Sequence, residues 1–280
     1  MSKENTAVTK KKIKRCKEDV VFDAACFIIL TLVLFVVAYP LYWVIISSIS
    51  APSAVSSGKV LLHPIGFTLK GYAEVFKNDQ VMRGFLNSLI ITFCGVMVNL
   101  IVTLPTSYAL SRSNFSGKKP ITIFYLITMF FGGGLIPTYL VIQRLQMLNT
   151  IWALILPGCL SVYNMIVART FFKSNISEEL YEAAEIDGCT QARFFFQIAL
   201  PLSKAIIAIL VLYYGVGHWN SYFSALVYIS DKAKYPLQLV LRNILITNQT
   251  ALSQTATTAA ARAALQEKQQ LIDVMKYALI

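Results

Sequence analysis

Charged residues are scarce in this sequence, since Asp, Glu, Lys and Arg together occupy 14% of its 280 positions. A soluble domain carries about a quarter charged residues. Hydrophobic residues fill 56% of the positions, and the mean hydropathy is +0.60. Too few polar side chains remain to cover a water-facing surface, so the composition argues against a soluble domain and favours a chain surrounded mostly by lipid.

Acidic residues are scarcer than basic ones, with 14 Asp and Glu against 25 Lys and Arg. In a soluble protein this excess would suggest nucleic acid as a partner. Here the basic residues cluster at the ends of apolar runs, as topology signals do. No basic face carries interleaved aromatic residues for stacking on bases. We therefore expect a lipid bilayer, and no nucleic acid, as the partner of the chain.

Residues suited to metal or redox chemistry are few and scattered. His63 and His218 are far apart, and no two of the five cysteines have CxxC spacing. This pattern argues against zinc and iron–sulfur sites, and we expect the cysteines to be small apolar helix residues without a disulfide. The sequence has no GxxxxGKS or GxxxxGKT loop, so the chain should not bind ATP itself. We expect neither a metal nor a cofactor.

Long hydrophobic runs, by contrast, are abundant, and a membrane span needs about 20 mostly apolar residues. The sequence predicts a basic segment at 1–19, followed by an all-α membrane domain over 20–280. The run at 271–280 begins like a last span, but its ten residues are too few to cross a bilayer. Complete spans are expected at about 20–49, 85–110, 120–142, 150–172 and 201–229.

The orientation of the spans follows from the first of them. Segment 1–19 contains seven Lys and Arg, which places the N-terminus on the cytoplasmic side. The first apolar run is too long for a secretory signal and lacks a small-x-small cleavage site, so we interpret it as an uncleaved span. Segments 50–84 and 230–270 are then external, and the loop at 173–200 is cytoplasmic.

The loop at 173–200 contains the signals of two short helices. Ser177 can cap a helix with an acidic first turn, and Gly188 can end that helix in the left-handed conformation. Thr190 can cap a second helix, after which Pro201 starts the fifth span. The sequence therefore predicts a compact helix–turn–helix between two spans.

The first of these two helices has the features of a docking surface. Leu180, Ala183 and Ala184 fall at i, i+3 and i+4 and form a narrow apolar face, and the two alanines let another surface come close. Glu182 and Glu185 offer charge to a partner. An ordinary connecting loop would need only a few polar residues, so this pattern predicts a docking element.

The stretch EAAEIDGCTQARFFFQIALP, at 182–201, matches the EAA motif of ABC-importer permeases: Glu-Ala-Ala, three residues, Gly, nine residues and Ile-x-Leu-Pro. Asp187 before the glycine resembles the carbohydrate-importer branch. The stretches FFGGGLIPTYL, YYGVGHWNSYFSALVYI and YPLQLVLRNIL resemble bacterial permeases for complex oligosaccharides, and the resemblance covers nearly the whole chain. The motif residues are Glu182, Ala183, Ala184, Gly188, Ile198, Leu200 and Pro201.

This resemblance implies the transmembrane domain of a type I ABC importer of the maltose type. Such a domain has about six helices, the last one incomplete in this sequence, and a cytoplasmic N-terminus. It implies a non-enzymatic permease subunit in a bacterial plasma membrane, which forms the path for an oligosaccharide together with a second homologous permease. The other implied partners are two cytoplasmic ATP-binding subunits and an extracellular lipid-anchored solute-binding protein.

The resemblance also implies that the motif's helix is the coupling helix, which sits in a cleft of the ATP-hydrolysing subunit. Asp187 and the run Phe194 to Phe196 would hold this helix to its own membrane domain. The residues expected to couple the chain to the ATPase are Glu182, Ala183, Ala184, Asp187, Gly188 and Phe194.

Polar residues within the spans are candidates for the translocation path, because polar groups in a membrane usually face a cavity or one another. Aromatic faces and amide groups suit sugars. The alternative is hydrogen bonding between helices of the bundle, and it stays open for each residue. The candidates are Asn99, Asn164, His218, Trp219, Asn220, Ser221 and Tyr222.

Other functions also stay open. An ABC permease for amino acids or another solute would carry the same motif. An ion-coupled secondary transporter would favour inverted repeats and buried Asp, Glu or Arg, whereas the spans show only Asp23 near an inner end and no convincing repeat. An intramembrane enzyme would need a titratable companion for His218, and no paired-carboxylate or Ser/His/Asp constellation occurs in any loop.

Overall fold

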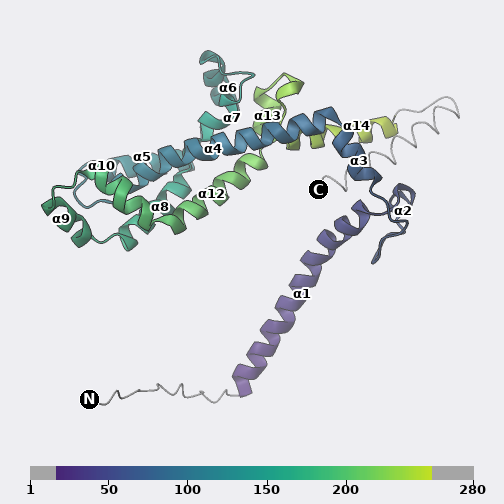
Figure 1. The fold of residues 1–280 in the computed structure, drawn as a ribbon, viewed down its shortest axis with the longest axis horizontal. Helices are drawn as coiled ribbons and strands as arrows, with labels where there is room; N and C mark the ends of the chain where they lie inside the picture. The colour runs from purple at the N-terminus through teal and green to yellow at the C-terminus, as the bar shows by residue number, and fades with distance from the viewer. Residues whose placement is uncertain (1–16, 254–280) are drawn as a thin grey trace. The chain divides into compact units, whose positions relative to one another are not determined.

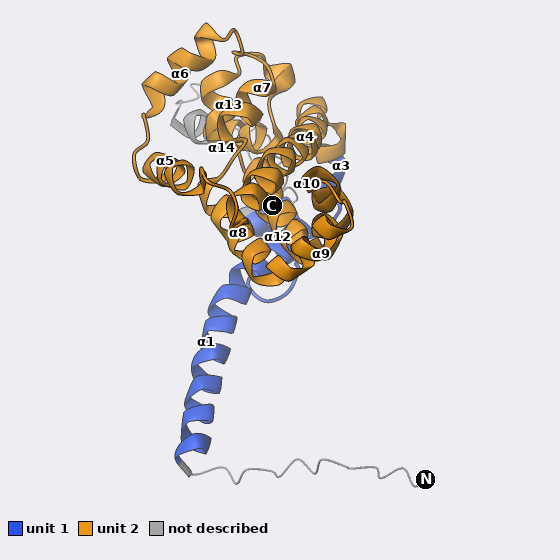
Figure 2. Cartoon of the chain, turned by 90° about the vertical axis from the view of Figure 1, so that its left-hand side faces the viewer, with its two compact units in different colours: residues 1–73, 263–280 blue, residues 74–262 orange. Residues whose placement is uncertain are grey.

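The computed structural model describes residues 17–253, and every element in that part of the chain is helical, which confirms the all-α fold class. By length and composition, α1 (Lys17–Ser48) and α4 (Asp79–Ser111) can each cross a membrane, and three bent helix pairs bring the number of candidate spans to as many as five. The basic stretch at 1–16 and the run at 271–280 lie outside the described residues. The chain forms two compact units, 1–73 with 263–280 and 74–262 (Figure 2).

The first unit is built on α1, whose most apolar stretch contains no buried residue. A helix that is apolar all round suits lipid or another hydrophobic partner. Beyond α1 the short helix α2 (Pro52–Ser56) starts with a proline at its first position, where the missing N–H is not needed. A small core joins the end of α1 to α2 and the loop beyond it, and its buried members are Ile46, Ala54, Val55 and Val60.

The second unit is organised around α4, which follows α3 (Lys70–Lys77). Asn78 caps α4, because its side-chain oxygen accepts hydrogen bonds from two backbone N–H groups of the first turn. Helices α8 (Val162–Asn175) and α12 (Lys204–Trp219) pack against α4 (Figure 1). Small and polar residues allow this close packing, and those buried on α4 include Gly84, Ser88, Gly95, Asn99, Thr103 and Ser107.

Three of the helical paths in this unit are broken. Helices α5 (Lys118–Phe130) and α6 (Leu135–Arg144) meet at 114°, across the glycine run that ends at Gly134 with φ of 85°. The pair formed by α7 (Trp152–Ile155) with η1 (Leu156–Gly158) bends by 52° before α8, and a third bend of 80° precedes α12.

The fifth helical path differs from the prediction of one span over 201–229. Pro201 lies in α11 (Leu200–Leu202), before the 80° bend, so the long helix starts at Lys204 rather than at Pro201. Helix α12 then ends at Trp219, and α13 (Phe223–Tyr228) is separate. The break follows a π-helical segment, which a local sequence pattern does not reveal.

The segment after residue 230 was expected to be external, and no helix was predicted in its first part. It contains η3 (Lys232–Lys234) and a 17-residue helix, α14 (Leu237–Ser253). Hydrogen bonds attach it to α4, because the Asn87 side chain donates to the carbonyls of Ala233 and Tyr235, and the Leu237 N–H donates to the Ser88 hydroxyl. The rest of the predicted external segment, beyond residue 253, lies outside the described residues.

Candidate functional site

The predicted docking element is a short helix, α9 (Glu178–Ile186), at one end of α4 (Figure 1). The helix starts as predicted, with Ser177 as its N-cap and an acidic first turn. Ser177 has an extended backbone, and its side chain accepts a hydrogen bond from the Leu180 N–H at 3.3 Å. Glu178 and Glu179 lie in the first turn, where carboxylates interact favourably with the positive end of the helix dipole.

The end of α9 is a Schellman motif built on Gly188, whose φ is 75°. The Cys189 N–H donates to the Ala184 carbonyl at 2.9 Å, and the Gly188 N–H donates to the Glu185 carbonyl at 3.0 Å. A side chain at residue 188 would meet no atom within 4 Å. Glycine is therefore needed for its backbone conformation rather than for space, which confirms that Gly188 ends the helix.

A second helix follows at once and runs back to the membrane domain. Thr190 caps α10 (Gln191–Phe194) through the Arg193 N–H, as predicted. The chain continues through a π-helical turn, η2 (Phe195–Ala199), into α11. Single π-helical turns are rare and occur often at functional sites.

The aromatic run of this second helix is divided between core and surface. Phe194 and Phe195 are buried in one hydrophobic core with Tyr108 and Phe172. The Tyr108 ring lies 5.0 Å from the Phe195 ring and 5.7 Å from the Phe172 ring, centre to centre. Phe196 is 65% exposed. Phe194 and Phe195 thus fix the docking element formed by α9 and α10, here called the knob, to the membrane domain. Phe196 does not share that packing.

The two faces of α9 also differ in burial, one lying in the core and the other at the surface. Tyr181 is buried against Phe194, and Ala184 packs on the same core. The opposite surface is open, and Ile186 is 87% exposed. The predicted apolar face is therefore split, since Ala184 faces inward. The exposed residues of α9 are Glu179, Leu180, Glu182, Ala183, Glu185 and Ile186.

Asp187 is the C-cap residue of α9, and its side chain is exposed. It was expected to help hold the knob to the membrane domain. The structure shows no hydrogen bond or ion pair of its carboxylate with any described residue. A carboxylate at the negative end of a helix dipole is locally unfavourable, so its position is better suited to an external contact than to internal anchoring.

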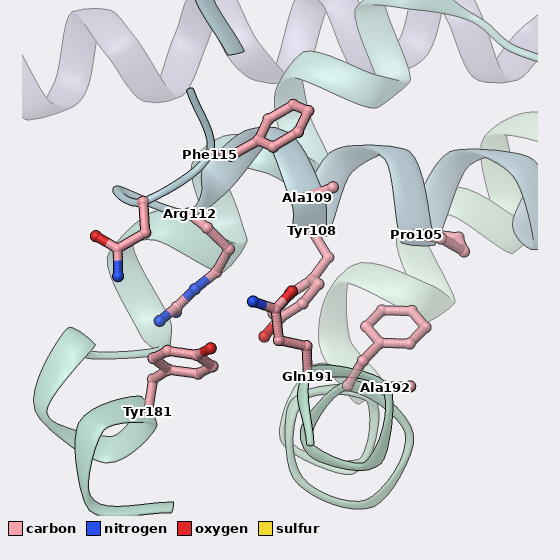
Figure 3. Close-up of a pocket in the computed structure, with 10 residues that line it drawn as sticks. Pro105, Tyr108, Ala109, Arg112, Phe115, Tyr181, Gln191 and Ala192 are labelled. Carbon is pink, nitrogen blue, oxygen red and sulfur yellow. The ribbon is translucent and has the colours of Figure 1, made fainter. Parts of the chain in front are cut away.

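Arg112, just after α4, ties α9 to the membrane domain, and sequence reasoning did not find it (Figure 3). Its guanidinium forms an ion pair with Glu178 at 3.2 Å and lies over the Tyr181 ring, 4.1 Å from the ring centre. The Ser113 hydroxyl also donates to Glu178. Stacked arginine combines charge with flat contact, so Arg112 holds both the first turn and the buried face of α9.

A cavity of about 280 Å³ lies between this knob and the end of α4 (Figure 3). Its walls come from α4, the α4–α5 loop, α9 and α10. Its lining residues are Pro105, Tyr108, Ala109, Arg112, Asn114, Phe115, Tyr181, Gln191, Ala192 and Phe195.

The polar residues of the predicted path are not gathered in one place. Asn99 is fully buried, and its amide donates to the carbonyls of Gly158 and Cys159 at 2.8 and 3.0 Å. Its oxygen lies 2.7 Å from Nε2 of His218. Asn99 and His218 therefore join α4, α12 and the break before α8, which favours the alternative of hydrogen bonding within the bundle for these two residues.

The neighbours of His218 have separate surroundings. The Trp219 ring meets the Phe85 ring edge-on at 5.9 Å, and the Tyr222 ring lies 5.7 Å from the guanidinium carbon of Arg242. The exposed Asn220 side chain donates to the Val216 carbonyl in its own helix. Ser221 donates its N–H to the His218 carbonyl, and Asn164 is buried on α8.

Among the described residues, no cluster of three or more His, Cys, Asp or Glu could hold a metal ion. Four cysteines of residues 17–253 are free thiols: Cys26, Cys94, Cys159 and Cys189.

Comparison with known proteins gives the class. No family model matches the chain. The polygalacturonan/rhamnogalacturonan transport system permease protein YtcP of Bacillus subtilis (strain 168) is 38% identical over 225 residues, which is 80% of this chain and 78% of that protein. Protein LplC of the same organism is 39% identical over 226 residues, covering 81% and 76%.

A solved structure shares the fold. One chain of a bacterial ABC transporter involved in the import of the acidic polysaccharide alginate has a TM-score of 0.83 and 25% sequence identity, covering 96% of this chain and 93% of that one. The fold and the knob together are those of a helical membrane protein of the ABC importer type. With relatives this similar, the chain belongs to the family of ABC transporter permeases for sugars and oligosaccharides. This membership replaces the alternative of an ion-coupled secondary transporter.

Proposed function

We propose that this chain is the permease subunit of an ATP-driven importer and that α9 docks into a cytoplasmic ATPase subunit. The observation that carries the proposal is the division of α9 into two faces. One face is fixed to the membrane domain by Tyr181, Ala184 and Arg112. The other exposes small and acidic residues, among them Ala183 and Glu182. A helix that is fixed on one side and exposed on the other can dock into a cleft of a partner subunit, which we call the socket.

The proposed mechanism is rigid-body coupling. When the ATPase subunits close on nucleotide, the socket moves and carries α9 with it. Because Phe194 and Phe195 pack on Tyr108 of α4, the movement reaches α4, which packs with α8 and α12. Packed helices shift as units between discrete arrangements. The chain itself carries out no covalent chemistry, and a second homologous permease completes the path.

The proposed substrate is an oligosaccharide, received from an extracellular lipid-anchored binding protein in a bacterial plasma membrane. We further propose that it is acidic. The relative named for polygalacturonan and rhamnogalacturonan is 38% identical, whereas the one named for galactooligosaccharides is 29% identical. The similar solved transporter imports an acidic polysaccharide. Arg242, stacked near Tyr222, offers a cation and an aromatic face to a uronate.

The substrate proposal is tested by transport competition in cells that express the complete transporter. Unlabelled digalacturonate should reduce uptake of labelled digalacturonate, and galactobiose at the same concentration should not. Equal competition by the two sugars, or uptake of galactobiose alone, would exclude an acidic substrate class while leaving the permease function in place.

Docking is tested by co-purification of the ATPase subunit with the membrane-inserted permease. Glu182→Lys reverses the charge at the centre of the exposed face of α9, and recovery of the ATPase should fall at least several-fold. Asp79→Lys is the matched control, because Asp79 is an exposed acidic residue in the first turn of α4. Undiminished recovery with Glu182→Lys would remove α9 as the docking element.

A further inference from the structure

The loop that follows α2 in the first unit is bound along the side of α1 by three aromatic side chains. Nε1 of Trp43 donates to the Val60 carbonyl at 2.8 Å. The Tyr42 hydroxyl donates to the Leu62 carbonyl at 2.6 Å, and the Tyr39 hydroxyl lies 3.5 Å from the Leu61 carbonyl. Three consecutive carbonyls thus face α1, and the chain has turned back along the helix that it left.

The depth of this contact follows from helix geometry. The candidate span in α1 has 31 residues, or about 46 Å at a rise of 1.5 Å per residue. The hydrocarbon core of a bilayer is about 30 Å thick, so a centred helix extends roughly 8 Å beyond it at each end. Trp43 and Tyr42 lie five and six residues before Ser48, where α1 ends, which places them at the boundary of the hydrocarbon.

Trp and Tyr are the residues that concentrate at this boundary, where their polar tips reach water and their rings reach the acyl chains. Backbone carbonyls that reach the hydrocarbon side of this boundary need protein donors, because acyl chains supply none. The aromatic side chains of α1 supply these donors to the loop. The loop's backbone is therefore satisfied at a depth where an ordinary solvated loop would not be.

The side chains of the loop are sorted between two environments. Val60 is buried with Ile46, Ala54 and Val55. Leu61 and Leu62 are 61% and 67% exposed, and Phe67 is 71% exposed. These exposed apolar side chains follow directly on the exposed apolar helix α1 in the chain, and lipid would cover both.

The charges of the segment agree with a lipid surface. From Tyr39 to Ala73 the sequence contains no Asp or Glu. Lys59, His63 and Lys70 are exposed, so Leu61 and Leu62 are flanked by a lysine and a histidine. Basic residues beside apolar ones attract anionic headgroups.

We propose that residues 59–70 form a membrane-interface strap, which inserts Leu61, Leu62 and Phe67 into the outer leaflet and places Lys59 and Lys70 among anionic headgroups. The strap would fix the depth and tilt of α1 in the bilayer. This inference does not rest on the docking role of α9, and it adds a membrane contact to the expectation that 50–84 is external.

The test uses the full chain, assembled with its partner subunits and reconstituted in vesicles of phosphatidylethanolamine and phosphatidylglycerol. All five cysteines are replaced by serine, and a nitroxide label is attached at Leu62→Cys. Collision with oxygen, which dissolves in lipid, should exceed collision with a water-soluble nickel chelate. At the control Ser57→Cys, on the exposed cap of α2, the order should be reversed.

The tether is tested in the same system. Tyr42→Phe with Trp43→Phe keeps α1 apolar and removes the two shorter of the three hydrogen bonds, so the label at position 62 should become more accessible to nickel. Three results would overturn the proposal: nickel access at position 62 equal to that at position 57, a label shielded from both reagents by a partner subunit, or no response to loss of the donors. Membrane insertion of each variant is checked by resistance to carbonate extraction.

Discussion

His218 lies against the backbone of α4, and this contact decides the role of the polar residues inside the helices. A Cβ added at Gly95 would come within 2.5 to 2.7 Å of three His218 ring atoms. Four residues further along α4, Asn99 bonds to the same ring and to the carbonyls of Gly158 and Cys159. These carbonyls lie at a helix break, where a donor must come from outside the helix. The group is therefore a structural junction.

Gly95→Ala should displace the His218 ring and weaken its bond to Asn99. Overpacking of a close contact costs about 1–3 kcal/mol, so the thermal unfolding temperature of the purified protein in detergent should fall. Gly217→Ala is the matched control, since a Cβ there meets no atom within 4 Å. Equal unfolding temperatures for the two variants would contradict the tight contact.

At the scale of elements, Arg112 joins the α4–α5 loop to α9 by an ion pair and a stacked ring. With Arg112→Gln the ATPase should still co-purify, because the exposed face of α9 is unchanged. Its hydrolysis should respond less to the substrate-loaded binding protein, because α9 is no longer held firmly to α4. The readout is the ratio of stimulated to basal ATP hydrolysis in proteoliposomes.

Two further variants separate coupling from general damage. Lys119→Gln, an exposed cation in the first turn of α5 just after this loop, should leave the ratio unchanged. Arg112→Glu with Glu178→Arg restores the ion pair with reversed polarity and should recover part of the lost stimulation. A ratio that stays normal in Arg112→Gln would show that the aromatic packing alone transmits the motion.

The elements also show what a sequence can predict. The caps Ser177 and Thr190 and the stop at Gly188 depend on residues a few positions away, so local patterns were enough to find them. Arg112 contacts residues of α9, which are far from it in the sequence. The Asn99–His218 bond likewise joins two helices that are far apart in the sequence. Such contacts are set by packing. Likewise, the bend after Pro201 follows a π-helical turn, where the sequence predicted one continuous span.

At the scale of the whole chain, membership in the carbohydrate permease family follows from relatives and fold, while docking, topology and substrate are proposals. The two faces of α9 link the residue, element and whole-chain scales. Ser177 and Gly188 limit the helix, Tyr181 and Arg112 fix it, and Ala183 is exposed beside carboxylates. The central claim is that this exposed surface contacts an ATPase.

The most direct test is site-specific photo-cross-linking in the assembled transporter. With a benzophenone amino acid at Ala183, irradiation should join the permease to the ATPase subunit, in a product detected by mobility and mass spectrometry. The same amino acid at Gln80, an exposed position in the first turn of α4, should give no such product. Absence of an ATPase adduct from Ala183, with the complex intact, would contradict the account.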